Sequence, residues 1–168
     1  QSARIPDYFI RTPCQTLAWA PNMDTGSTMR QSSIAFKSKG VDLEGIAAFP
    51  QGRLGTIPGV VICHPHPLFG GDMDNNVVVS VCKALVEEGF ATLRFNFRGV
   101  GNSEGHFTGG EEEREDVLMA LQFLRQWPGV NKGRLGLAGY SFGASMVLSG
   151  LSRFKVSRSF AMISPPLA

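Results

Sequence analysis

The sequence predicts an α/β fold, in which a mostly parallel sheet carries helices on both faces and follows an N-terminal antiparallel hairpin. Three observations predict this class: short apolar runs alternate with segments of helical period, the runs are rich in β-branched residues, and glycine or proline separates the segments. The length of 168 residues suits one domain, and 43% hydrophobic against 18% charged residues is typical of a globular protein.

Each element has its own signal. The first two strands are expected to form a hairpin that turns near Lys39 and Gly40, and the wholly apolar run Gly59–Cys63 suits a central strand covered on both faces. The helices show apolar stripes at helical spacing, and Gly89 is a plausible stop for the first. The stripe of the first helix is Val77, Val78, Val81 and Leu85, and that of the second is Val117, Leu118, Leu121 and Leu124. Strands are expected at 31–36, 43–49, 59–63, 91–97, 134–138 and 158–164, and helices at 74–89, 111–127 and 144–151.

Residues 1–29 show neither the helical nor the strand spacing of apolar residues, so we expect an irregular N-terminal extension there and a partial α/β domain over 30–168. The net charge of +2 argues against nucleic acid or anionic membrane as a partner, and no apolar run reaches the length of a membrane span. Cys14, Cys63 and Cys82 are odd in number and far apart, no secretory signal is visible, and no metal-ligand spacing occurs. We therefore expect a cytoplasmic protein with free thiols, of which Cys63 and Cys82 are buried.

The segment Gly139-Tyr140-Ser141-Phe142-Gly143 lies between a predicted strand and a predicted helix. A serine flanked by glycines in that context predicts a nucleophile elbow, a strained turn that lifts the hydroxyl clear of the sheet. The alternative is a chance occurrence of the Gly-x-Ser-x-Gly pattern, since the chain has 20 glycines, but the strand–turn–helix context favours the elbow. The N–H of Phe142, directly after the serine, would then be one donor of an oxyanion hole.

The loop His64–Gly71 directly follows the central strand, where a second oxyanion donor is expected. Pro65 and Pro67 have no N–H, so His66 is the best donor by elimination and Leu68 the next.

Other uses of these polar residues stay open. His64 and His66 could bind a metal, although no further spaced ligands accompany them, or one of them could be the catalytic base. A third motif, Arg98–Gly105, superficially resembles a dinucleotide-binding loop, but its Gly-x-Gly-x-x-x-Gly spacing is one residue too long and no helix opens there. We expect a tight glycine-rich loop near the rim of the site.

Three motifs in this order, His64-Pro-His-Pro-x-x-Gly-Gly71, Arg98-Gly-x-Gly-x-Ser-x-Gly105 and Gly139-x-Ser-x-Gly143, resemble the α/β-hydrolase superfamily, in particular its small, capless esterase-like and dienelactone-hydrolase-like branch. The resemblance covers about residues 30–165. It implies hydrolysis of small-molecule acyl substrates (esters, lactones, thioesters or peptides) without metal or organic cofactor. The site residues it implies are the nucleophile Ser141, the oxyanion donors His66 and Phe142, the active-site loop with His64, Leu68, Gly70 and Gly71, and the elbow glycines Gly139 and Gly143.

The chain departs from this family after the elbow. The triad of the family runs Ser, then Asp or Glu, then His, but no acidic residue follows Asp116 and no histidine follows His106. We therefore expect a C-terminally truncated domain that lacks the last strands and is nearly inactive by itself. The apolar strand around Phe160–Ile163 would then lie uncovered at a sheet edge, where self-association to a homo-oligomer is plausible. Alternatives are a non-catalytic binding or assembly protein, or a peptidase or acyltransferase.

Overall fold

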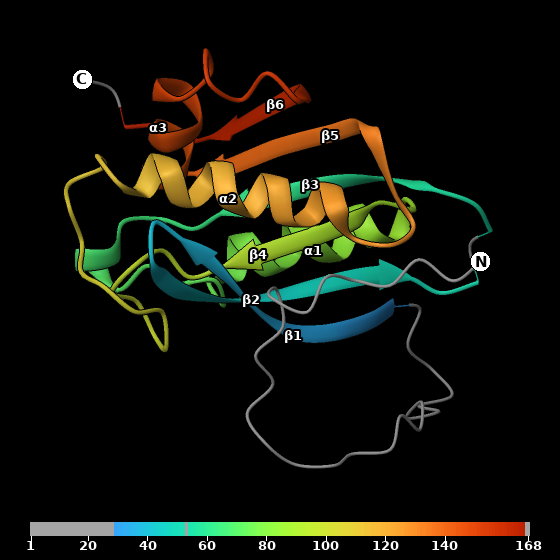
Figure 1. The fold of residues 1–168 in the computed structure, drawn as a ribbon, viewed down its shortest axis with the longest axis horizontal. Coiled ribbons are helices and arrows are strands. Elements are labelled where there is room, and N and C mark those ends of the chain that lie inside the picture. Colours follow the sequence, from blue (N-terminus) through green and yellow to red (C-terminus); the bar gives the residue numbers. More distant parts are fainter. Residues whose placement is uncertain (1–28, 53, 167–168) are drawn as a thin grey trace.

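The computed structural model describes residues 29–52 and 54–166, and within these residues six strands form one mixed sheet in the order β1-β2-β4-β3-β5-β6 (Figure 1). β1 and β2 are antiparallel, β2 is antiparallel to β4, and β4, β3, β5 and β6 are parallel, which confirms the predicted fold class. The strands are β1 Met29–Ser38, β2 Val41–Pro50, β3 Ile57–Cys63, β4 Ala91–Phe95, β5 Val130–Tyr140 and β6 Ser157–Ile163. The helices are α1 Asn76–Glu87, α2 Glu113–Gln126 and α3 Phe142–Ser149, with a short 3₁₀ turn η1 at Pro67–Phe69.

The N-terminal hairpin turns at Lys39 and Gly40, whose φ values are 45° and 90°. Positive φ at both central residues is typical of a type I′ turn, whose twist matches that of the flanking strands. The predicted hairpin is therefore confirmed. Of the extension expected over residues 1–29, all but Met29 lies outside the described residues, and Met29 is the first residue of β1.

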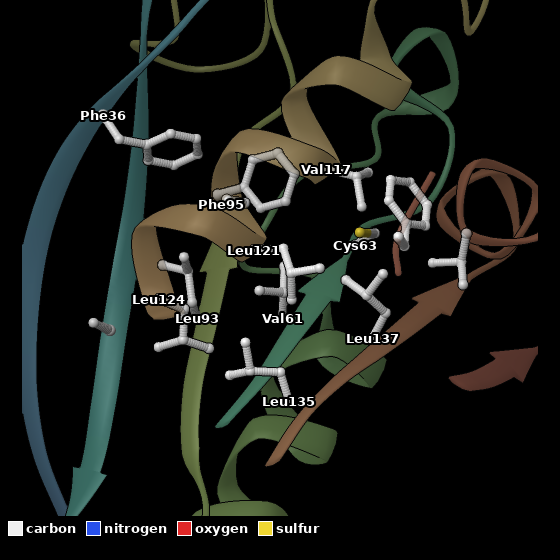
Figure 2. Close-up of a cluster of buried hydrophobic side chains, with 14 of the residues drawn as sticks. Phe36, Val61, Cys63, Leu93, Phe95, Val117, Leu121, Leu124, Leu135 and Leu137 are labelled. Carbon is white, nitrogen blue, oxygen red and sulfur yellow. The ribbon is translucent and has the colours of Figure 1, made fainter. Parts of the chain in front are cut away.

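Helices cover both faces of the sheet. α2 and α3 pack on one face, where Leu121 and Leu124 meet strand residues such as Val61 (Figure 2). α1 covers the opposite face, where Cys82 packs with Ile62. Successive residues of β3 thus enter opposite cores, which explains why this strand is apolar without alternation.

The buried stripe and the first residue of α1 differ from those predicted. Its buried residues are Val78, Cys82 and Val86, with Val81 and Leu85 at the margin, so the expected place of Val77 in the stripe is wrong. The helix begins at Asn76, two residues later than expected, because the Asn75 side chain accepts the N–H of Val77 at 3.0 Å as an N-cap. Gly89, at φ 90°, ends the helix as predicted.

The strand boundaries at the end of β4 and at the start of β5 differ from expectation for identifiable reasons. β4 ends at Phe95 because the N–H of Phe97 bonds to a side chain, the ring of His64, instead of a neighbouring strand. β5 begins at Val130, which pairs with Ile57, although the residues that follow it are polar and exposed and carry no strand pattern. The ends of α2, α3 and β6 lie within two residues of the predicted ones.

β6 is the last strand at one edge of the sheet and pairs with β5. Its Phe160 and Met162 side chains are 37% and 40% exposed with respect to the residues that the structure describes.

Cys63 and Cys82 are buried free thiols, as predicted, and burial raises the pKa of both. Cys14 lies outside the described residues. No helix in the described part of the chain is long and apolar enough to cross a membrane.

Candidate active site

The three sequence motifs meet at one edge of the sheet. Cys63, the last residue of β3, is paired with Phe95 at the end of β4 and with Gly139 near the end of β5. The loops that leave these parallel strands therefore start side by side at the carboxyl edge, which is where open α/β sheets bind ligands. The structure thus brings the His64 loop, the Arg98 loop and the Ser141 turn together.

Ser141 has an unusual backbone conformation, with φ 52° and ψ −115° directly before α3. A positive φ is uncommon for a residue with a side chain and marks strain that the surrounding structure must hold. One anchor is the hydrogen bond from the N–H of Ser141 to the carbonyl oxygen of Ile163, at 2.9 Å. The Ser141 side chain is half-buried and makes no hydrogen bond to any residue that the structure describes.

The two elbow glycines permit close packing around this turn. A Cβ atom at Gly143 would overlap the carbonyl oxygen of Cys63 and lie 2.7 Å from that of His64. A Cβ atom at Gly139 would lie 2.5 Å from the backbone nitrogen of Ala144. Side chains at these positions would push α3 away from β5 and from the His64 loop, so the glycines bring the serine turn and that loop into contact.

His66 lies at the start of η1, in an extended conformation with φ −60° and ψ 122°. Its Nδ1 accepts the N–H of Leu68 at 3.2 Å, so this second candidate donor is already used within its own loop. The N–H groups of His66 and Phe142, in contrast, have no hydrogen-bond partner among residues 29–52 and 54–166. The two side-chain rings are neighbours, with centroids 5.0 Å apart. The geometry therefore leaves two open donors on adjacent motifs.

The rest of this loop folds onto His66. Its carbonyl oxygen accepts the N–H of Phe69 at 3.1 Å and that of Gly71 at 3.0 Å. Gly70 has a φ of 75°, and its N–H donates to the carbonyl oxygen of Pro67. A Cβ atom at Gly71 would overlap the carbonyl oxygen of Pro65, so the loop closes tightly. Leu68 and Phe69 remain 69% and 86% exposed at its tip.

His64 is fully buried below the loop. Its Nε2 accepts the N–H of Phe97 at 3.1 Å, and its Nδ1 lies 2.7 Å from the carbonyl oxygen of Pro65. Burial lowers the pKa of His64 from its ordinary value of 6.5 to about 4, against the opposing effects of the Pro65 carbonyl and the Asp72 charge. Since both ring nitrogens are engaged, the readings of His64 as a metal ligand or as a catalytic base have no support in this geometry.

This depressed pKa predicts acid sensitivity. Unfolded His64 binds a proton below pH 6.5 that the folded protein accepts only below about pH 4. The free energy of unfolding is therefore expected to fall as the pH drops through this window, by about 3 kcal/mol from this residue. Urea unfolding at pH values across the window measures the slope, and His64→Gln is the control that should lose this component. Equal slopes in the two proteins would contradict the prediction.

Acidic residues at the start of α2 form ion pairs with Arg98 and anchor its loop, a role that was not predicted from the sequence. Acids in the first turn of a helix are favourable towards its dipole, and from the sequence they need no other partner. Arg98 and Asp116 are instead both buried and form a two-pronged ion pair, with Nε to Oδ2 at 3.0 Å and Nη2 to Oδ1 at 2.7 Å. Ser38 of β1 donates to the same carboxylate at 2.6 Å, and Glu112 also pairs with Arg98. The available signal was an arginine directly after the strand predicted at 91–97.

Glu113 anchors the second half of this loop. Its buried carboxylate accepts the N–H and hydroxyl of Thr108, each at 2.8 Å, and the N–H of Gly110 at 2.7 Å. The anchored segment carries Phe107, whose ring centroid lies 5.1 Å from that of His66 and 5.5 Å from that of Phe142. The loop thus supplies an aromatic wall beside the two open N–H groups.

No histidine or carboxylate among the described residues hydrogen-bonds to Ser141. His106, the remaining histidine, is exposed and is not part of the packed site. The structure therefore places a serine and two open N–H donors together, without a base or acid beside them in the described residues.

Comparison with known proteins extends this picture. An α/β serine hydrolase homologue from Coxiella burnetii is 35% identical, with a TM-score of 0.71 over 80% of this chain and 63% of that one. An α/β serine hydrolase without a lid from Xanthomonas campestris is 32% identical, with a TM-score of 0.73 over 81% of this chain and 62% of that one. An uncharacterized protein of Rickettsia prowazekii is 41% identical over 110 residues, which are 66% of this chain and 46% of that protein. The chain thus spans less than two thirds of the length of each of these relatives.

The lidless relative agrees with the expected capless branch of the superfamily. In addition, the model of one family, described as X-Pro dipeptidyl-peptidase (S15 family), matches residues 6–163. The match spans all three motifs and nearly the whole sheet. The chain therefore belongs to the X-Pro dipeptidyl-peptidase (S15) family of α/β hydrolases.

Proposed function

We propose that the protein is a serine hydrolase of carboxylic ester-type substrates, with Ser141 as the nucleophile and the N–H groups of His66 and Phe142 as the oxyanion hole. One observation carries this proposal: two N–H groups without described partners lie on adjacent motifs beside a serine in a strained turn. A protein that used the same fold only for binding would have no need to hold a serine in this way. Esters, lactones and thioesters share the electrophilic carbonyl that such a site polarises.

The reaction follows from these positions. The Ser141 oxygen forms a bond to the carbonyl carbon while its proton passes to a base, and the electron pair of the C=O bond moves to the carbonyl oxygen. That oxyanion accepts the N–H groups of His66 and Phe142. Collapse of the intermediate breaks the bond to the alcohol or thiol, which takes the proton from the base. Water then attacks the acyl-serine by the same steps and releases the carboxylic acid.

We propose that the base and the acid that orients it come from polypeptide outside these 168 residues, because the sequence has no acid after Asp116 and no histidine after His106. Without a base, a serine hydroxyl is a weak nucleophile at neutral pH. The 168 residues alone are therefore expected to retain only the part of the rate enhancement that comes from the oxyanion hole and substrate binding.

A fluorophosphonate probe tests the nucleophile in the full-length natural protein. The Ser141 oxygen should displace fluoride and form a bond to phosphorus, which adds the mass of the phosphonyl group to the peptide that contains Ser141. Ser141→Ala should abolish labelling, whereas Ser149→Ala, at the far end of α3, should leave it unchanged. Labelling at another residue, or none, would refute the proposed nucleophile.

Peptide hydrolysis is the second candidate, because the matching family model describes an X-Pro dipeptidyl-peptidase. Both reactions use the same serine and oxyanion hole, so the site geometry does not separate them. The full-length protein should therefore be assayed with a p-nitrophenyl ester and with an X-Pro p-nitroanilide. A higher kcat/KM on the ester is expected, and a higher value on the anilide would reassign the function to peptide hydrolysis.

A further inference from the structure

The buried ring of His64 connects two backbone segments at the edge of the site. Its Nε2 faces the N–H of Phe97, just after β4, and its Nδ1 faces the carbonyl oxygen of Pro65, in the loop after β3. The side chain is fully buried, and its contact to Phe97 is shielded from water. The reaction proposed above gives this histidine no chemical step.

These contacts determine the tautomer. A backbone N–H can only donate, so Nε2 of His64 must be the accepting nitrogen opposite Phe97. The ring proton of the neutral imidazole is then on Nδ1, from where it is donated to the Pro65 carbonyl oxygen at 2.7 Å. A protonated ring would set a second donor against the N–H of Phe97, and burial further disfavours that charged form.

The acceptor of this hydrogen bond belongs to the same peptide unit as the proposed oxyanion donor. The C=O of Pro65 and the N–H of His66 are the two ends of one planar amide and point in opposite directions. A bond that fixes the C=O also fixes the N–H, and it polarises the amide so that the N–H becomes a better donor. We infer that His64 is a positioning residue that aims the N–H of His66 at the oxyanion, an inference that rests on the proposed function.

The surrounding contacts support this role. The ring of Phe97, whose N–H holds His64, lies 5.6 Å from the ring of Phe142, the residue that carries the second open N–H. His64 thus joins the loop of one donor to the aromatic packing of the other. Apart from this hydrogen bond, the Pro65 carbonyl oxygen has no hydrogen-bonding donor among the described residues. His64 is therefore the one described side chain that holds this carbonyl by a hydrogen bond, in a loop that Gly71 also packs against.

Two substitutions of His64 test the contributions of its two ring nitrogens individually. The amide nitrogen of Asn at position 64 reaches the place of Nδ1 and can still donate to Pro65, whereas the amide oxygen of Gln reaches the place of Nε2 and can only replace the contact to Phe97. In the full-length protein, His64→Gln is expected to lower kcat on a p-nitrophenyl ester by about tenfold to a hundredfold with KM nearly unchanged. His64→Asn should retain most of the kcat. Equal losses in both variants, or no loss in either, would overturn the inference.

A second measurement does not depend on activity. Long-range ¹⁵N NMR of the wild-type protein at neutral pH should show the proton of His64 on Nδ1, and a proton on Nε2 would overturn the inference. His64→Gln should also shift the amide proton of His66 upfield, and His64→Asn should not. If the wild type neither hydrolyses the ester nor reacts with the fluorophosphonate, the proposed function fails, while these signals still decide whether His64 orients the peptide.

Discussion

Replacing His66 by proline is expected to lower kcat on an ester by about two to three orders of magnitude in the full-length protein while the fold is kept. The φ of −60° at His66 already matches the angle that a proline ring imposes, and its ψ of 122° is compatible with the Pro67 that follows. The N–H has no hydrogen-bond partner among the described residues, so its removal breaks no described backbone bond. The substitution thus deletes one proposed oxyanion donor with little other change to the backbone.

His66→Ala is the matched control for this experiment. It removes the imidazole, with its contacts to Phe107 and Phe142, but keeps the backbone N–H. We expect its kcat to fall by less than about tenfold, because the oxyanion donor remains. Circular dichroism and urea unfolding check that both variants are folded. If the alanine and proline variants lose the same activity, the ring rather than the N–H is what matters at this position.

Asp116→Asn is expected to lower the free energy of unfolding by about 3–5 kcal/mol, the largest stability effect that we predict. The Arg98 and Asp116 side chains are 3% and 0% exposed, so neither charge is hydrated in the folded protein. Among the described residues, neutralising the carboxylate leaves the guanidinium with only the half-exposed Glu112 as an ion-pair partner, and it weakens the bond from Ser38. The expected loss is large because the buried positive charge of Arg98 would lack its negative partner. It does not imply that the Arg98–Asp116 pair is itself strongly stabilising.

Urea unfolding at neutral pH measures this effect. Lys37→Met is the control, because it breaks an ion pair with Asp42 of similar length, 2.7 Å, whose partners are 57% and 37% exposed. Pairs of this kind contribute less than about 1 kcal/mol. If Asp116→Asn and Lys37→Met destabilise the protein equally, the Arg98 network does not hold the loop in the way the structure indicates.

The contrast between these positions shows what can be predicted from the sequence. The parallel strands and the Ser141 turn were predictable because their signals are local: a β-branched run, a stop glycine, and a serine between glycines. The burial of Glu113 and Asp116 was not, because a carboxylate in the first turn of a helix has the same sequence pattern whether it faces water or a distant arginine. The polar start of β5 after Val130 was not predictable either, because an irregularity between the pairs Ile57–Val130 and Gly59–Leu135 adds polar residues that carry no strand pattern.

The same limit applies to the loop after β3. The sequence identified His66 by elimination of the prolines, but it offered Leu68 as a second donor and metal binding or base catalysis as uses of His64. In the structure the N–H of Leu68 bonds to the ring of His66, which argues against Leu68 as an oxyanion donor. The two ring nitrogens of His64 contact Phe97 and Pro65, which argues against metal binding and base catalysis by His64. Rotamers and the ring orientation determine such contacts, and no spacing rule specifies them.

The strand order has a consequence for synthesis on the ribosome. β4 lies between β2 and β3, although it follows both in the chain. The β1–β2 hairpin can close as soon as residue 50 has emerged from the ribosome, but its inner edge stays unpaired until residues 91–95 emerge. During that interval the nascent chain exposes an open strand edge and an apolar β3, a species prone to non-native pairing. Slow translation between residues 63 and 91 would therefore prolong the period in which this protein is most exposed to misfolding.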